Sequence, residues 1–145
     1  QTEVITRKGY YRILSVLLNV VDGGTGNRLR RPPYSITAQT GGKTGTTNDN
    51  ADGWFMAFTP ELVSATWVGG EERYIHFNSM AQGQGASMAL PIYGKYIRRV
   101  YDDPTLPYDQ DARFHFPAGV DLCGGEGVAA EEEQTVDEAI SGAFD

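Results

Sequence analysis

The residues of this chain with the clearest chemical potential lie in one short segment, Gly41-Gly42-Lys43-Thr44-Gly45-Thr46-Thr47. A lysine and hydroxyl groups set among glycines suit a loop that holds an anion close to the backbone. One interpretation is the phosphate-binding motif G-x-x-x-x-G-K-[ST]. That motif needs glycine where this chain has Thr37, and it must open into a helix, which Gly45 and the polar run 48–53 would interrupt. We therefore do not expect nucleotide binding.

The second interpretation is a Lys-Thr-Gly triplet on a strand, Lys43-Thr44-Gly45. This triplet is the third sequence element of the active-site serine enzymes that act on penicillin and D-Ala-D-Ala peptides. Its context is more specific than the triplet itself. Thr46-Thr47 follows, then Asp52-Gly53-Trp54-Phe55 with a run to Val63, and then Trp67-Val68-Gly69-Gly70.

This order closely resembles the end of the transpeptidase domain in class A (bifunctional) penicillin-binding proteins. There, Lys-Thr-Gly-Thr-Thr precedes an Asp-x-Trp-Phe strand and a Trp-Val-Gly strand. The likeness covers about residues 10 to 101, including Gly24-Thr25-Gly26 upstream and Gln84-Gly85-Ala86 downstream. Monofunctional relatives usually carry Ala and Gln where this chain has Thr47 and Asn48, and serine β-lactamases are less similar over the two tryptophan strands.

The family's nucleophile lies in Ser-x-x-Lys, and no serine of this chain is followed by lysine three residues later. We therefore nominate no nucleophile, and expect it upstream together with Ser-x-Asn, a glycosyltransferase domain and a membrane anchor. A chain that opens at Gln1 reads as an excised piece of such a protein. Residues 1–120 are assigned to the C-terminal portion of the transpeptidase domain, and 121–145 to an acidic, disordered tail.

The resemblance implies a role for each residue of the strand. Lys43 is expected to set positive charge near the terminal carboxylate of a peptidoglycan stem peptide and to assist proton transfer, and Thr44 to donate its hydroxyl to that carboxylate. Gly45 lets the ligand pair as an added strand. The N–H of Thr46 is expected to be an oxyanion-hole donor. Lys43 and Thr46 are thus the expected catalytic residues, and Lys43, Thr44, Gly45, Thr46 and Thr47 the expected substrate-binding set.

The same resemblance implies the function of the whole enzyme. It would be a serine-type D-Ala-D-Ala transpeptidase that cross-links stem peptides through an acyl-enzyme, binds β-lactams and sits on the outer face of the bacterial cytoplasmic membrane. This chain is expected to be soluble and inactive by itself, with membrane contact only through the anchor. A fragment of a β-lactamase-like serine hydrolase and a non-catalytic binding or scaffold module stay open as alternatives.

No metal or organic cofactor is implied. His76 and His115 have no cysteine or carboxylate at ligand spacing, so a metal site is not expected. The large aromatics, Trp54, Phe55 and Trp67 among them, are expected to pack in the core or on a strand face and not to act as substrate platforms.

The elements that must position the strand give an α+β fold, with an antiparallel sheet of three to four strands packed against helices. Apolar residues on two stripes predict a largely buried helix over 10–21, with Thr6 as N-cap and a stop at Gly23-Gly24, where a left-handed residue closes the last turn. A second helix is predicted near 90–102, with Pro91 in its first turn. Its buried face is expected to carry Ile92, Tyr96, Ile97 and Val100.

Short β-type runs punctuated by glycine predict strands at about 36–47, 54–59 and 62–68. The link Thr59-Pro60-Glu61 predicts a hairpin between the last two. Asn48, Asp49, Asn50 and Asp52 predict a polar turn between the first two. Phe114, Phe116 and Val120 are candidates for one more short strand.

Charge is distributed unevenly along the chain. The net charge is -7, yet all twelve Lys and Arg lie before residue 120, where they face eleven acids, and eight acids follow in 121–145. The acidity therefore belongs to the tail. Basic residues cluster only at Arg28, Arg30 and Arg31, which we expect to be a solvated loop, so nucleic acid is not an expected partner. Cys123 is the single cysteine and forms no internal disulfide.

Overall fold

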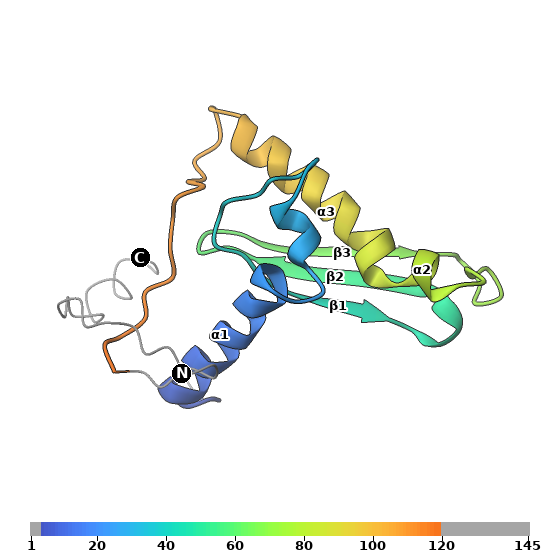
Figure 1. Cartoon of the computed structure of the whole chain (residues 1–145), viewed down its shortest axis with the longest axis horizontal. Helices are drawn as coiled ribbons and strands as arrows, with labels where there is room; N and C mark the ends of the chain where they lie inside the picture. Colours follow the sequence, from blue (N-terminus) through green and yellow to red (C-terminus); the bar gives the residue numbers. More distant parts are fainter. Residues whose placement is uncertain (1–3, 120–145) are drawn as a thin grey trace. The chain divides into compact units, whose positions relative to one another are not determined.

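A computed structural model of the chain describes residues 4–119. Its elements are shown in Figure 1: α1 (Arg7–Asp22), η1 (Asn27–Arg30), β1 (Gly41–Thr46), η2 (Asn48–Asn50), β2 (Asp52–Phe58), β3 (Val63–Gly69), α2 (Met80–Gly83) and α3 (Gly85–Asp102). The strands form one antiparallel sheet in the order β1-β2-β3, which confirms the predicted α+β class. The described residues divide into two compact units, 13–114 and 4–12 with 115–119.

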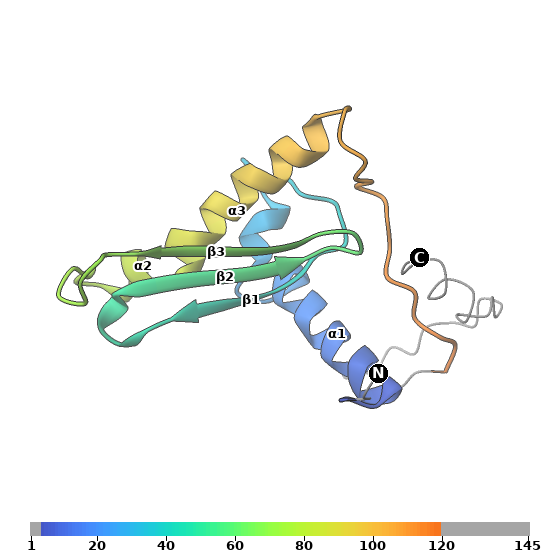
Figure 2. The ribbon, with the colours of Figure 1, turned by 180° about the vertical axis from the view of Figure 1, so that it is seen from behind.

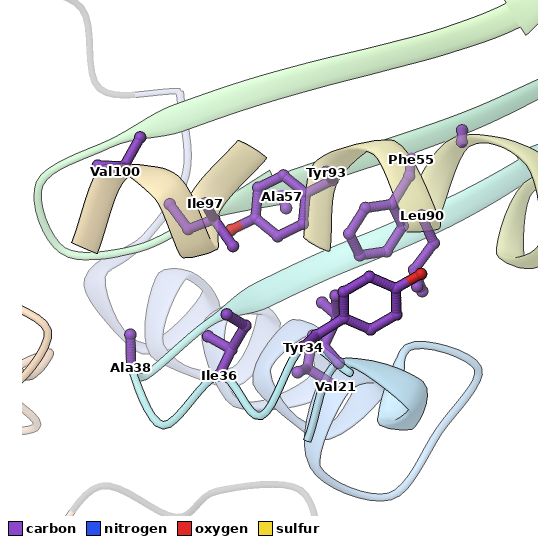
Figure 3. Close-up of a cluster of buried hydrophobic side chains, with 12 residues drawn as sticks. Val21, Tyr34, Ile36, Ala38, Phe55, Ala57, Leu90, Tyr93, Ile97 and Val100 are labelled. Carbon is purple, nitrogen blue, oxygen red and sulfur yellow. The ribbon is translucent and has the colours of Figure 1, made fainter. Parts of the chain in front are cut away.

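The core of unit 13–114 lies between one face of the sheet and α3. Successive side chains of a strand point to opposite faces, so β2 turns Gly53, Phe55 and Ala57 toward α3. Figures 1 and 2 show α3 crossing the sheet obliquely, and Figure 3 shows its side chains over β2. The rings of Phe55 and Tyr93 meet with their centroids 5.3 Å apart. The other core residues are Val21, Leu29, Tyr34, Ile36, Ala38, Ala89, Leu90, Ile97 and Val100.

Helix α1 begins as the sequence predicts. The N–H of Gly9 donates to Thr6 Oγ1 at 3.2 Å, so Thr6 is the N-cap. The helix ends at Asp22, and the next two residues, Gly23 and Gly24, both donate to the Asn19 carbonyl. Within residues 4–119, Gly119 is the one glycine with positive φ, so the predicted left-handed closure is wrong.

The prediction that both apolar stripes of α1 are buried is also wrong. Leu14, Leu18 and Val21 are buried, whereas Ile13 and Val16 stay 51% and 49% exposed. Only one stripe meets a packing partner in the described part of the chain. The second stripe therefore gives the helix an apolar outer surface.

The three strands are confirmed with changed bounds: β1 is shorter than predicted, β2 begins two residues earlier, and β3 is shifted by one residue. Residues 36 to 40 precede β1 as irregular chain, although Ile36 and Ala38 are in the core. The predicted hairpin is confirmed, since the Thr59 N–H donates to the Leu62 carbonyl at 2.8 Å and the Leu62 N–H donates to Thr59 Oγ1 at 3.2 Å. Residues 114–119 form no strand, and Val120 and the acidic tail lie outside the described residues.

The second helix begins earlier than predicted. It starts at Gly85, so Pro91 is its seventh residue and not part of its first turn. It ends at Asp102, before Pro104 as expected. Ile92 and Tyr96 are about half exposed, and Tyr93 fills the core position in their place. The packing of this face on the sheet keeps the chain helical across Pro91. The burial of apolar side chains stabilises the helix by more than the loss of one backbone hydrogen bond at the proline costs.

The prediction that Arg30 is solvated is wrong as well. Its Nε and Nη2 bind Asp22 Oδ1 at 2.9 and 2.6 Å, and its Nη1 donates to the carbonyls of Ile36 and Ala38 at 2.8 and 2.7 Å. One guanidinium thus ties the end of α1 to the segment that leads into β1. No helix among residues 4–119 is both long and apolar enough to span a membrane.

A first prediction concerns Tyr93, whose buried hydroxyl makes no hydrogen bond of normal geometry within residues 4–119, although the Thr40 side chain lies close enough to favour its ionised form slightly. Replacing Tyr93 by Phe keeps the ring and removes a polar atom without a partner, so the melting temperature at neutral pH should stay equal or rise. Burial raises the pKa of Tyr93, so above about pH 10 the phenol ionises in the unfolded chain first and wild-type stability falls as pH rises. The variant should lose less stability over that range.

Thermal denaturation of the full chain near neutral pH and above about pH 10 measures both effects. Tyr96→Phe, at a half-exposed position of the same helix, is the matched control. A lower melting temperature for Tyr93→Phe with an unchanged alkaline slope would contradict the prediction.

Candidate functional site

The glycine-rich segment singled out in the sequence forms the edge strand of the sheet. β1 pairs with β2 on one side, from Gly41 opposite Phe58 to Thr46 opposite Gly53, and no strand pairs with its other side in the described part of the chain. Figure 2 shows β1 at the rim of the sheet. An unpaired strand edge presents a row of backbone donors and acceptors.

Along β1, the backbone N–H and C=O groups of successive residues point alternately toward β2 and toward the unpaired edge. The Thr47 N–H, directly after the strand, donates to the Asp52 carbonyl at 3.0 Å, so Thr47 faces β2. Backbone groups alternate between the two sides of a strand, so those of Lys43 and Gly45 also face β2. The N–H and C=O groups of Thr44 and Thr46 therefore point to the free edge.

The side chains of Lys43 and Thr44 lie on opposite faces of the sheet, as alternation predicts. Lys43 is opposite Met56 on the exposed face, and Thr44 is opposite Phe55 on the α3 face. The Lys43 ammonium nevertheless donates to the Thr44 carbonyl at 2.7 Å. Because that carbonyl points to the free edge, the ammonium reaches the edge as well.

The Thr44 hydroxyl approaches the edge region from the other face. Thr44 Oγ1 lies 3.2 Å from Thr25 Oγ1, within hydrogen-bonding distance. Thr25 follows α1 in the turn at residues 23–26, which Arg30 helps to fix through Asp22. A cation and a hydroxyl thus flank one strand edge, an arrangement that suits an extended ligand with a carboxylate.

The hydroxyls of Thr46 and Thr47 are engaged within the protein. Thr46 Oγ1 accepts the N–H of Gly85 at 3.1 Å. Thr47 Oγ1 accepts the N–H of Asp52 at 2.9 Å and donates to Asp52 Oδ2 at 3.1 Å. The groups of Thr46 that remain for a ligand are its backbone N–H and C=O, and the N–H is the group that the resemblance implies as an oxyanion-hole donor.

Helix α3 begins directly against the backbone of β1 and β2. A Cβ on Gly85 would collide with the carbonyl oxygens of Gly45 and Trp54. Only glycine permits this approach, and it brings the Gly85 N–H within reach of Thr46. The helix start therefore holds the C-terminal end of β1 in place.

The structure brings all five predicted site residues onto one strand and its following turn. It adds Thr25, Asp52 and Gly85 as their contacts, and Trp67 as a partner of Asp52, which the sequence signalled only through the resemblance. Of the aromatics, Phe55 is core, whereas Trp54 and Trp67 pair on the exposed sheet face with ring centroids 6.4 Å apart. Among residues 4–119, no group of three or more His, Cys, Asp and Glu side chains could hold a metal ion.

The chain has relatives among known proteins. It is 38% identical over 100 residues to penicillin-binding protein 1A of Rickettsia bellii, a match that covers 68% of this chain and 12% of the relative. It is 34% identical over 125 residues to penicillin-binding protein 1A of Neisseria cinerea, covering 86% and 14%. No family model matches the chain.

A solved structure is also similar. The crystal structure of penicillin-binding protein 1A from Haemophilus influenzae matches 72% of this chain and 16% of its own, with a TM-score of 0.58 and 29% identity. The chain thus spans about an eighth of the length of the curated relatives it matches.

A second prediction tests the contact at the start of α3. Replacing Gly85 by Ala forces the helix away from β1 and β2, which should cost about 1 to 3 kcal/mol of stability and break the bond to Thr46 Oγ1. Gly23→Ala is the control, because its Cβ would meet the flexible Asn19 side chain at 3.3 Å and no positive φ is required. Chemical denaturation measures both variants, and equal stabilities would contradict the tight packing.

Proposed function

We propose that this chain, which belongs to the family of the penicillin-binding proteins 1A as its motifs predicted, has a specific part in that family's chemistry. It supplies the substrate-binding edge of a peptidoglycan D,D-transpeptidase. The observation that carries the proposal is the free edge of β1. The Lys43 ammonium reaches this edge, the Thr46 N–H points to it, and the Thr44 hydroxyl flanks it.

The proposed ligand is a stem peptide that ends in D-Ala-D-Ala. Its extended backbone adds to the sheet beside β1, pairing with the groups of Thr44 and Thr46 that β2 leaves free. Its terminal carboxylate forms an ion pair with the Lys43 ammonium and accepts a hydrogen bond from the Thr44 hydroxyl. β-Lactams occupy the same edge.

The reaction divides between this chain and a serine outside it. The serine attacks the peptide carbonyl, terminal D-Ala leaves, and an amine of a neighbouring stem peptide resolves the acyl-enzyme to form the cross-link. The Thr46 N–H donates to the oxygen on which negative charge develops, and Lys43 assists proton transfer. The parent protein acts on the outer face of the cytoplasmic membrane and carries a glycosyltransferase domain as well.

A third prediction separates ligand binding from folding in the parent enzyme. Thr44→Val keeps the shape and removes the hydroxyl, so β-lactam acylation should slow by about ten- to a hundredfold, equivalent to about 1.5 to 3 kcal/mol. Lys43→Ala should slow it at least as much, because a charge is lost. Second-order acylation rates and melting temperatures are measured together.

Thr66→Val is the matched control, since Thr66 lies on β3 opposite Phe55 and away from the free edge. Its acylation rate should stay close to that of the wild type. Near-normal acylation in both edge variants at unchanged stability would leave β1 as an ordinary strand and remove the support for this function.

A fourth prediction concerns this chain alone. Without an activated serine it should form no covalent adduct with a fluorescent penicillin, because an isolated hydroxyl is a weak nucleophile at neutral pH. Labelling followed by denaturing electrophoresis is the test, with the parent enzyme as positive control. A stoichiometric band from the 145-residue chain would show that it carries a nucleophile of its own.

A further inference from the structure

The turn that follows β1 is held in a conformation that its own backbone does not favour. Asp49 and Asn50 have positive φ values of 62° and 56°, in the left-handed region. Aspartate and asparagine tolerate this region better than other non-glycine residues, but at a cost that surrounding contacts must offset. The contacts that hold this turn therefore decide where β1 ends.

One carboxylate supplies several of these contacts. Asp52 Oδ2 accepts the hydroxyl of Thr47 at 3.1 Å, and Asp52 Oδ1 accepts the indole N–H of Trp67 at 3.1 Å. The backbone of Asp52 closes the turn, since its N–H donates to Thr47 Oγ1 and its carbonyl accepts the Thr47 N–H. We call Asp52, Thr47 and Trp67 the Asp52 clamp.

The clamp spans all three strands on the exposed face of the sheet. Asp52 begins β2, Thr47 follows β1 and Trp67 belongs to β3. Gly69, opposite Asp52, leaves room for it, because a Cβ there would lie 2.5 Å from both Asp52 Oδ1 and the Trp67 ring. The carboxylate and the indole thus meet in a space that a larger residue would close.

The clamp acts next to the Thr46 N–H. Residue Thr46 is held from both faces of the sheet: the clamp fixes the next residue, Thr47, on the exposed face, and the Gly85 N–H binds the Thr46 hydroxyl on the α3 face. With Thr46 held in this way, its N–H, which belongs to the preceding Gly45–Thr46 peptide, stays directed toward the free edge of β1. Catalysis by a fixed donor depends on such preorganisation.

We infer that Asp52 is a positioning residue for transpeptidation, which aims the Thr46 N–H at the reacting carbonyl by clamping Thr47 to Trp67. This inference rests on the proposed function. Asp52 itself does not touch the substrate; it acts through Thr47 on the backbone of Thr46.

The test is β-lactam acylation of the parent enzyme, with the acylation step measured separately from binding. Asp52→Ala should slow the acylation step by about ten- to a hundredfold, the range for a misplaced catalytic group, and change the binding constant much less. Asp52→Asn keeps an acceptor for Trp67 and should recover most of the rate. Trp67→Phe removes one arm of the clamp and should cause a smaller loss.

Ile97→Val is the matched stability control, since Ile97 is fully buried on the inner face of α3 and remote in sequence from the clamp. It should lower the melting temperature without slowing acylation. If Asp52→Ala slows acylation no more than this control while the wild type acylates normally, the inference is overturned and the proposed function stands.

Failure of the proposed function has a different signature, in which the wild-type parent forms no adduct at all. In that case, hydrogen exchange at the backbone amides of Thr47 and Asp52, measured on this chain, tests whether the clamp holds the turn. Faster exchange there in Asp52→Ala than in Ile97→Val would support the clamp as the device that holds the turn. Equal exchange in the two variants would overturn it.

Discussion

The antiparallel pairing of β1 with β2 is the constraint on which the candidate site depends. Once the Thr47 N–H bonds to the Asp52 carbonyl, every backbone group of β1 has its side assigned. If β1 slipped by one residue, the backbone N–H and C=O groups of Thr44 and Thr46 would face β2. The side chain of Lys43 would then lie on the α3 face. The register is protected because that slip would bring the Lys43 side chain onto the packed α3 face and would part the Thr46 hydroxyl from the Gly85 N–H.

The hydroxyls around the end of β1 are used for support, and under the proposed function it is the backbone of the strand that acts on the ligand. Thr46 and Thr47 both direct their hydroxyls at protein groups, one toward Gly85 and the other toward Asp52. Satisfied polar groups of this kind rigidify their surroundings. A donor that must stabilise charge at one point gains from such rigidity, since it need not reorganise when the charge appears.

The sequence predicted the strands because β-type runs punctuated by glycine are local signals, and the resemblance around Lys43-Thr44-Gly45 supplied the site residues of β1. Prediction from the sequence failed where distant packing decided. Helix α3 extends back to Gly85 because that glycine fits against Gly45 and Trp54, a contact between residues about 40 positions apart, and local rules placed Pro91 at the start instead. Arg30 was assigned to solvent for the same reason, since its carbonyl partners depend on the fold of residues 36 to 38.

Under the proposed function, the hydrogen bond made by Lys43 affects how a ligand binds at the free edge of β1. Its ammonium donates to the Thr44 carbonyl, an acceptor that an added strand would need for its own N–H. The ligand N–H would therefore compete with the ammonium for that carbonyl, and the ligand carboxylate would offer the ammonium a new partner. The exchange replaces one charge-assisted hydrogen bond by an ion pair and a backbone bond, so a peptide with a free carboxylate is favoured over one that is amidated at its end.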